Sequence, residues 1–202
     1  MDQKTLTLQL HHHGAWHDAG TVALYDLDAG VAGRTRVAYD LGYFAELGAV
    51  PLHEGRPLRG IEALSARLPV SLDDVSEETW PPFLLDVLPQ GHARRKIAEH
   101  LGLDAEAPSS EPALLERTGA APIGNVRVKE AYAEAMTRLE DQVYRQDRAH
   151  NETGAWFGLP MEEILDRSDR FRDLADRFAF IASGSSGLQG EWPKVALTQA
   201  AD

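Results

Sequence analysis

The chain separates its strand-type patterns from its helix-type patterns, and this order restricts the fold class more than any other feature. Residues 6–10 (LTLQL) alternate apolar and polar side chains, which is the period of a half-buried strand. Gly14 and Gly20 are expected to interrupt the strand pattern, which resumes over residues 21–27 and again over about 34–41. Short strands joined by glycine-containing turns, with helices after them, predict an α+β fold that begins with a small antiparallel β subdomain.

Helices are predicted from the early seventies onward. Ser71 and Ser76 have the side chains and spacing of helix N-caps, and the acidic pairs near them (Asp73/Asp74 and Glu77/Glu78) are expected at helix starts. Pro81 and Pro82 suit the start of a helix over FLLDVL (83–88), which Pro89 should end.

Three further segments have helical signatures. Residues 91–103 predict a helix that ends near Gly102, and residues 109–128 predict a cap, a short helix stopped at Gly119, a turn and a strand. From Lys129 onward, apolar residues recur at steps of three and four, which predicts an amphipathic helix. Because residues 104–112 (DAEAPSSEP) are loop-like, we expect one domain over 1–106 and a second over 107–202.

Composition narrows the class of protein. The 202 residues are 43% apolar and 26% charged, which is typical of a globular protein with a real core. The net charge of −12 argues against direct binding of nucleic acid, and the lack of cysteine excludes disulfides and thiolate metal sites. Neither a signal peptide nor an apolar run of roughly 20 residues is seen, so we expect a cytoplasmic protein that does not contact a membrane.

The segment SGSSGLQGEWPK (183–194) has the most specific composition in the chain. Gly184, Gly187 and Gly190 stand three apart between strand-type runs at 178–182 and 194–198. Glycine lacks a Cβ, so backbone N–H groups can approach phosphate oxygens, and Lys194 could add a positive charge. Strand, glycine loop and strand is the arrangement of a kinase nucleotide flap. From the pattern alone, a Gly/Ser hairpin without a ligand is the favoured interpretation.

Two other clusters were weighed as sites. His11, His13 and His17 offer nitrogen ligands for a metal, but no carboxylate is clearly placed to complete the set, so polar residues at a strand end are the favoured interpretation. HARRK (92–96) lies in a predicted helix of an acidic protein, which favours a solvated face or an intramolecular ion-pairing surface over a phosphate or RNA patch.

The order of three motifs resembles the HipA family of serine/threonine kinase toxins from bacterial toxin–antitoxin systems. The motifs are FLLDVLPQGHARRKIAEHLGL with its Leu88–Pro89 turn, LLERTGAAPIGNVRV from the helix before Gly119 to Val128, and GSSGLQGEWPKVAL. The resemblance implies a small β-rich N-terminal subdomain with helices over 1–106. It also implies that residues 107–202 begin a kinase N-lobe, with a helical insertion and a first β-hairpin that carries the glycine-rich loop.

The resemblance also assigns residues to ATP and to regulation. The loop would bind ATP phosphates through a set of six residues: Ser186, Gly187, Leu188, Gln189, Gly190 and Lys194. Family members autophosphorylate a serine in this loop. Counting back from Gly187 puts that serine at Gly184, so its neighbours Ser183 and Ser185 are the phosphorylation candidates. Mg²⁺ would belong to the complete kinase, because no D-x-x-x-x-N catalytic loop and no DFG occur in these residues.

Several functions therefore stay open. The chain would be the N-terminal part of a kinase that transfers phosphate from ATP to Ser/Thr of a protein substrate, inactive alone because catalytic and metal-binding residues are absent and the lobe looks truncated. The alternative is a stand-alone, antitoxin-like regulatory module that engages such a kinase, and a third interpretation is an unrelated α+β protein. The partners implied are a DNA-binding HipB-like antitoxin, the remaining kinase portion and the protein substrate.

Overall fold

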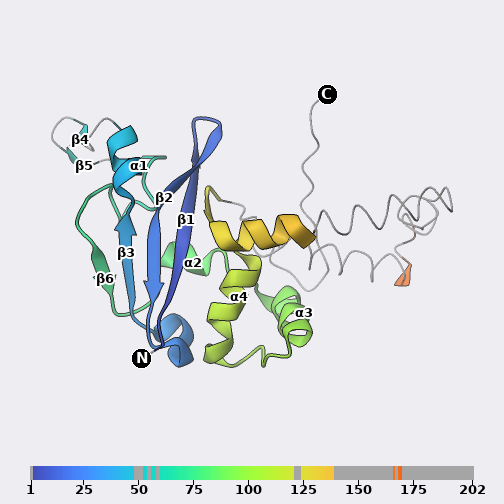
Figure 1. Ribbon diagram of the computed structural model, residues 1–202. Coiled ribbons are helices and arrows are strands. Elements are labelled where there is room, and N and C mark those ends of the chain that lie inside the picture. The colour runs from blue at the N-terminus through green and yellow to red at the C-terminus, as the bar shows by residue number, and fades with distance from the viewer. Residues whose placement is uncertain are drawn as a thin grey trace.

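A computed structural model describes residues 2–47, 52–53, 56–57, 60–120 and 124–138, together with 166, 168 and 169 (Figure 1). The glycine segment 183–194 and the strand predictions at 178–182 and 194–198 lie outside the described residues. The predictions for these segments therefore stay predictions.

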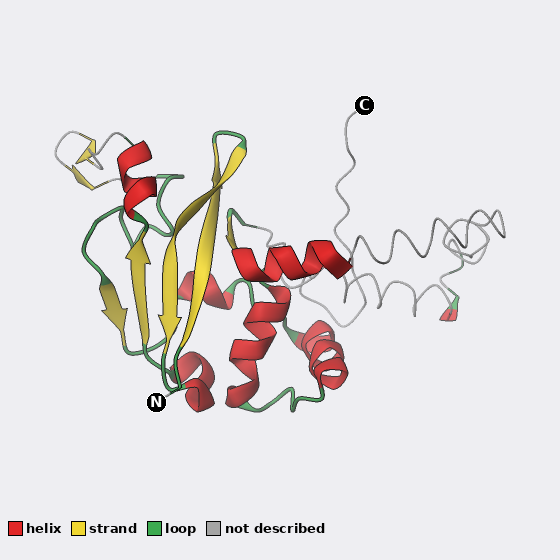
Figure 2. Cartoon of the chain, in the orientation of Figure 1, coloured by secondary structure: helices red, strands yellow, loops and turns green. Residues whose placement is uncertain are grey.

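The described part is an α+β fold built on a five-stranded antiparallel sheet (Figure 2). Its strands are β1 (Lys4–His12), β2 (Ala15–Leu24), β3 (Thr35–Tyr39), β6 (Val75–Glu77) and β7 (Val126–Val128). They lie in the order β6-β3-β2-β1-β7. A separate two-stranded sheet pairs β4 (Leu52–His53) with β5 (Arg56–Pro57).

Strands β1 and β2 form a tight hairpin with a bulge. His13 and Gly14 make the two-residue turn, and both have positive φ (48° and 81°), as a type I′ turn requires. Gly14 is thus a turn residue, as predicted. The prediction that Gly20 breaks the strand is wrong, because Gly20 lies inside β2, where a Cβ would overlap the carbonyl oxygen of Ala38 on β3. The register between β1 and β2 shifts after Leu8, so Ala19 is the extra residue of a β-bulge.

The helices are short. They are η1 (Leu27–Ala32), α1 (Leu41–Glu46), α2 (Pro82–Leu85), α3 (Gly91–Leu101), η2 (Pro108–Ser110) and α4 (Glu111–Thr118). Residues 129–138 form a further helix. Helices α3 and α4 pack against each other on the side of the sheet that holds β1 and β7 (Figure 1). None of the described helices is long and apolar enough to span a bilayer.

The predicted helix starts near residue 71 are wrong. Ser76 lies in β6, and the Ser71 hydroxyl accepts a hydrogen bond from the Asp73 N–H in a local turn. The acidic pairs there do not begin helices: Asp74 forms an ion pair with Arg36 of β3. The first α-helix comes earlier, at α1, where the Asp40 side chain accepts the Tyr43 N–H at 3.0 Å.

The later helix predictions are confirmed where the structure describes them. Pro82 begins α2 with Pro81 as its N-cap, although α2 ends at Leu85 rather than at Pro89. Gly102 ends α3 in the left-handed conformation (φ 68°), and Gly119 ends α4. The helix that follows Lys129 buries Ala131 and Ala135, in agreement with its apolar period.

One hydrophobic core joins the sheet to the helices. Leu6, Leu8 and Leu10 supply the core face of β1, and Leu84 of α2 and Leu114 of α4 pack into the same buried cluster. Strand β7 and helix α4 lie beyond the expected boundary at 106/107, yet they contribute to the same sheet and core as residues 4–101. The division into two domains at that point stays a prediction.

Candidate functional site

The residues predicted to bind ATP lie outside the described part of the chain, and the described part contains a separate candidate site. An open pocket of about 390 Å³ lies where η1, α2, α3 and α4 meet, beside the Leu88–Pro89 turn. We call it the Leu–Pro pocket. Its lining residues are Val31, Leu85, Leu88, Pro89, Gln90, Gly91, Arg94, Arg95, Glu106 and Glu111.

The turn that forms one wall of the pocket follows from its sequence. Helix α2 has a single turn, and the N–H groups of Val87 and Leu88 continue it with bonds to the carbonyls of Leu84 and Leu85. Pro89 cannot donate a backbone hydrogen bond, and Gly91 has a positive φ of 54°, so the chain changes direction before α3. The Thr118 hydroxyl of α4 donates to the Val87 carbonyl at 3.0 Å and fixes α4 to this turn.

A partly buried charge network centred on Glu111 lines the pocket. Its Oε2 accepts the backbone N–H of Val31 at 2.6 Å, and its Oε1 accepts Arg94 Nη2 at 3.2 Å. Arg94 Nε also donates to the Ala105 carbonyl at 2.6 Å. The side chains of Arg94 and Glu111 are only 19% and 13% exposed. Because each charge has more than one partner, the network joins α3, α4 and η1 without an unsatisfied charge.

Gly30 makes this network possible. It has φ 55° and ψ −130° inside η1, a conformation that is essentially restricted to glycine. A Cβ at this position would overlap Glu111 Oε2 and the Pro108 carbonyl oxygen. The carboxylate therefore reaches the Val31 N–H only because residue 30 has no side chain.

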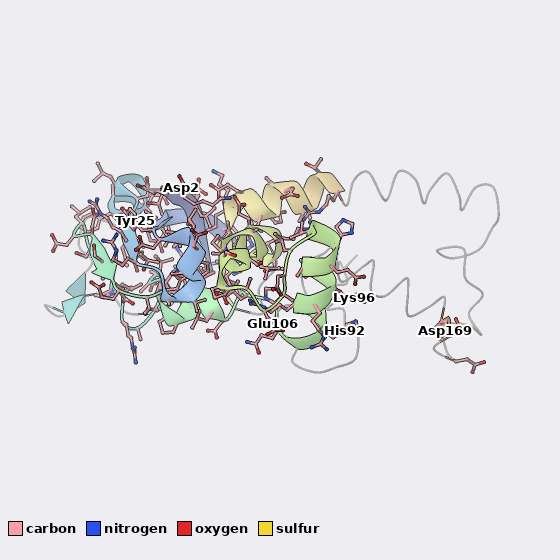
Figure 3. The ribbon with its side chains drawn as sticks, turned by 90° about the horizontal axis from the view of Figure 1, so that it is seen from below. Asp2, Tyr25, His92, Lys96, Glu106 and Asp169 are labelled. Carbon is pink, nitrogen blue, oxygen red and sulfur yellow. The ribbon has the colours of Figure 1, made fainter. Side chains whose placement is uncertain are left out.

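The HARRK helix behaves as an intramolecular ion-pairing surface, which confirms one of the interpretations favoured for it. Arg94 faces inward to Glu111, and Lys96 pairs with Glu99 on the surface at 3.3 Å. Figure 3 shows His92 and Lys96 on the outer side of α3, with Glu106 projecting from the neighbouring loop. Two acidic and two basic residues line the pocket, so its charge is balanced and does not select an anion. With its apolar residues Val31, Leu85 and Leu88, the pocket suits contact with a protein side chain better than catalysis.

A second polar cluster lies at the other end of the sheet, near the β1–β2 turn. His12, not His11 or His13, faces the core, and its ring stacks on that of His17 with centroids 4.1 Å apart and planes 6° apart. Tyr43 of α1 contacts His12 Nε2 through its hydroxyl at 2.9 Å. Burial, with help from the charges of His17 and His13, lowers the pKa of His12 below 6.5.

The geometry does not support a metal at these histidines. Within the described residues, no group of three or more His, Asp or Glu side chains is arranged to hold a metal ion. The polar strand end favoured from the sequence is correct for His11, which is exposed on β1. His13 is a turn residue, 3.4 Å from Glu62.

The family match found by comparison with known proteins covers most of the region around the pocket. Residues 56–129 match the family model of the HipA N-terminal domain, a stretch that includes α2, the Leu88–Pro89 turn, α3, α4 and β7. No curated protein matches the chain. The fold and the pocket thus belong to an α+β domain. No catalytic centre is assigned among the residues that the structure describes. Residues 56–129 are therefore similar to the N-terminal domain of the HipA family.

Two residues of the Glu111 network were not predicted from the sequence. Gly30 and Glu111 are far apart along the chain, and the Glu111 bond to Val31 spans 80 residues. No local pattern signals such a pairing.

Proposed function

We propose that the chain is the N-terminal part of a HipA-like toxin kinase, which transfers phosphate from ATP to a serine or threonine of a protein substrate. The observation that carries this proposal is the match of residues 56–129 to the HipA N-terminal domain. In the complete kinase, the substrate hydroxyl oxygen would bond to the γ-phosphorus, the bond from that phosphorus to the ADP oxygen would break, and the hydroxyl proton would pass to a base.

The described domain would serve this kinase as a packing and binding module. Its buried polar groups around Glu111 are engaged in joining helices, and the Leu–Pro pocket offers a charge-balanced surface with apolar residues. ATP phosphates would be held by the glycine segment, through Ser186 to Gly190 and Lys194, because glycine-rich backbone admits phosphate oxygens closely. Mg²⁺ would be bound by residues outside the 202, because these contain neither family metal motif.

Partners follow from the same proposal. A HipB-like DNA-binding antitoxin would supply any contact with DNA, since a net charge of −12 opposes direct binding. The other proposed partners are the remaining kinase portion and the protein substrate. We place the protein in the cytoplasm, as the toxin–antitoxin context suggests.

Three experiments test the kinase proposal. The 202-residue chain, incubated with Mg-ATP labelled at the γ-phosphate, should incorporate no label. The protein isolated from its own cells should have a larger intact mass and should incorporate label. Phosphopeptide mapping of that protein should find phosphate on Ser183 or Ser185, which would add close to two negative charges where ATP phosphates bind. A cellular protein of 22.2 kDa without kinase activity would contradict the proposal.

A stand-alone regulatory module is the second candidate, because residues from β1 to the helix after β7 share one hydrophobic core. We infer that such a unit would fold without the glycine segment. The 202-residue chain would then inhibit an active HipA-like kinase when added in stoichiometric amount. Unchanged phosphate transfer in that assay would exclude this candidate.

A further inference from the structure

The β-bulge in β2 brings two histidines, the buried His12 and the partly buried His17, into one stack. Without the extra residue Ala19, the alternation that buries Val22 and Leu24 would turn residue 18 to the core. The bulge turns His17 inward instead, opposite Leu10 of β1. His12 continues the buried positions of β1, so the two rings meet face to face with centroids 4.1 Å apart.

The hydrogen bonds of Tyr43 define the protonation of His12. The Tyr43 hydroxyl donates its only proton to the Glu62 carbonyl at 2.6 Å, so its contact with His12 must be an N–H donated by His12 Nε2. His12 is therefore the neutral tautomer with its proton on Nε2. Its Nδ1 is buried, and no atom in the described part of the chain makes a hydrogen bond with it. His17 Nε2 is buried in the same way.

The charged groups around the stack do not offer His12 a partner for a second proton. The Glu62 carboxylate lies 3.4 Å from His13 Nε2, and Glu46 of α1 lies 3.5 Å from His17 Nδ1. A proton on His13 or His17 thus has a carboxylate nearby. A proton on His12 Nδ1 would leave an unpaired charge in the core, against a parallel imidazole and with His11 and His13 on either side.

We propose that His12, His17 and Tyr43 form an acid-sensitive latch, which holds α1 and residues 60–64 on the sheet while His12 is neutral and releases them when it is protonated. The parts released are those that Tyr43 connects. Its ring lies on α1, its hydroxyl bonds to the Glu62 carbonyl, and the neighbouring Tyr39 hydroxyl accepts the Leu64 N–H at 2.8 Å. Once His12 leaves the stack, these contacts lose their shared support.

Amide hydrogen exchange of the full 202-residue chain, measured by NMR between pH 7.5 and 5.0, tests the latch. The N–H groups of Phe44 and Leu64 report on α1 and on residues 60–64. Corrected for intrinsic rates, both should be less protected than Val22 of β2, and their protection should fall between pH 6.5 and the lowered pKa of His12, by at most about tenfold per pH unit. His12→Phe keeps a stacked ring and should remove this pH dependence. His11→Phe, one residue away and exposed, should keep it.

A second measurement holds even where His12→Phe fails to fold. Ring ¹⁵N shifts of the unmodified chain should show His12 with its proton on Nε2 at pH 7.5, and its protonation should coincide with the loss of protection at Phe44 and Leu64. Three results would overturn the latch: a proton on Nδ1 at pH 7.5, pH-independent protection of Phe44 and Leu64, or protection equal to that of Val22 at every pH.

Discussion

The β1–β2 turn and the η1 helix lie toward opposite ends of the sheet (Figure 1), and the polar clusters beside them, around His12 and around Glu111, handle buried polarity in different ways. Around Glu111, an ion pair is shared with backbone groups, so each charge has several partners. Around His12, two imidazole rings stack, and each ring has one buried nitrogen that makes no hydrogen bond within the described part of the chain. The first cluster can bear charge at neutral pH and fixes the helices. The second is stable only while it is neutral, so its contribution depends on pH.

The largest effect is expected from a substitution at Gly30. It tests whether the Glu111 cluster depends on the close approach of the η1 backbone to the Glu111 carboxylate. Gly30→Ala should lower the free energy of unfolding by roughly 4 kcal/mol, because its Cβ overlaps Glu111 Oε2 and the Pro108 carbonyl at a strained φ. Gly14→Ala is the matched control. Gly14 also has a positive φ, but a Cβ there meets nothing within 4 Å, so the cost should be about 1 kcal/mol. Denaturant unfolding at pH 7.5 measures both. Equal costs would show that the approach at Gly30 is unimportant.

The charge network itself is tested by Glu111→Ala. Removing the carboxylate leaves the Val31 N–H and part of the Arg94 guanidinium without their acceptors, so the loss should be about 3 kcal/mol. Glu111→Gln keeps an acceptor oxygen and should lose less. Glu116→Ala breaks a half-exposed pair with Lys4 and should cost about 0.5 kcal/mol. If Glu111→Ala and Glu116→Ala cost the same, Glu111 is no more than a surface charge.

Local rules predicted much of the fold and little of these two clusters. Glycine at helix ends, proline at helix starts and strand alternation are properties of a few neighbouring residues, so the ends of α3 and α4 and the three first strands followed from the sequence. The strand β6 did not, because VSE is stabilised by pairing with β3, some 40 residues away. The hydrogen bond from the Val31 N–H to Glu111 joins residues that are still further apart in the sequence.

The alternating pattern of β1 extends beyond Leu10, where the predicted strand ended, into the histidines. Alternation through Leu6, Leu8 and Leu10 continues to His12, and this signal could have identified His12 as the buried residue of HHH. The inward position of His17 could not have been predicted, since it depends on the bulge at Ala19, and a shift of one residue moves a side chain to the other face. The glycine segment, which has the clearest local signal for nucleotide binding, stays a prediction.

The next largest effect is the expected difference between the His12 and Glu111 clusters in how their contribution to stability depends on pH. The pKa of His12 in the folded protein lies below its unfolded value of 6.5, so below pH 6.5 the unfolded chain binds a proton that the folded chain does not. Stability should therefore fall as the pH falls from 6.5 toward the folded pKa, by at most about 1.4 kcal/mol per pH unit, and should be constant above that window.

Unfolding curves at pH 7.5, 6.5 and 5.5 measure this slope. The range stays above the window of Asp18, whose pKa is lowered by its hydrogen bonds to Lys129 and Gln9, so that its contribution is lost only at more acidic pH. His12→Phe should flatten the slope, whereas Glu111→Gln should leave it unchanged at a lower stability. A flatter slope in Glu111→Gln would mean that the Glu111 cluster also titrates here, and the comparison between the two ends would fail.

The smallest effect is expected on the outer side of α3, where Lys96 and Glu99 are 52% and 73% exposed. Their pair is surrounded by water, so Lys96→Ala, Glu99→Ala and the double variant should each change stability by less than about 0.5 kcal/mol, with a coupling that disappears in 1 M salt. A double-mutant cycle measures it. A cost as large as that of Glu111→Ala would contradict the division of α3 into a structural inner face, with Arg94, and a solvated outer face.

If instead stability is unchanged but binding to an added HipA-like kinase is lost, the outer face of α3 is a contact surface, and its charges select a partner rather than support the fold.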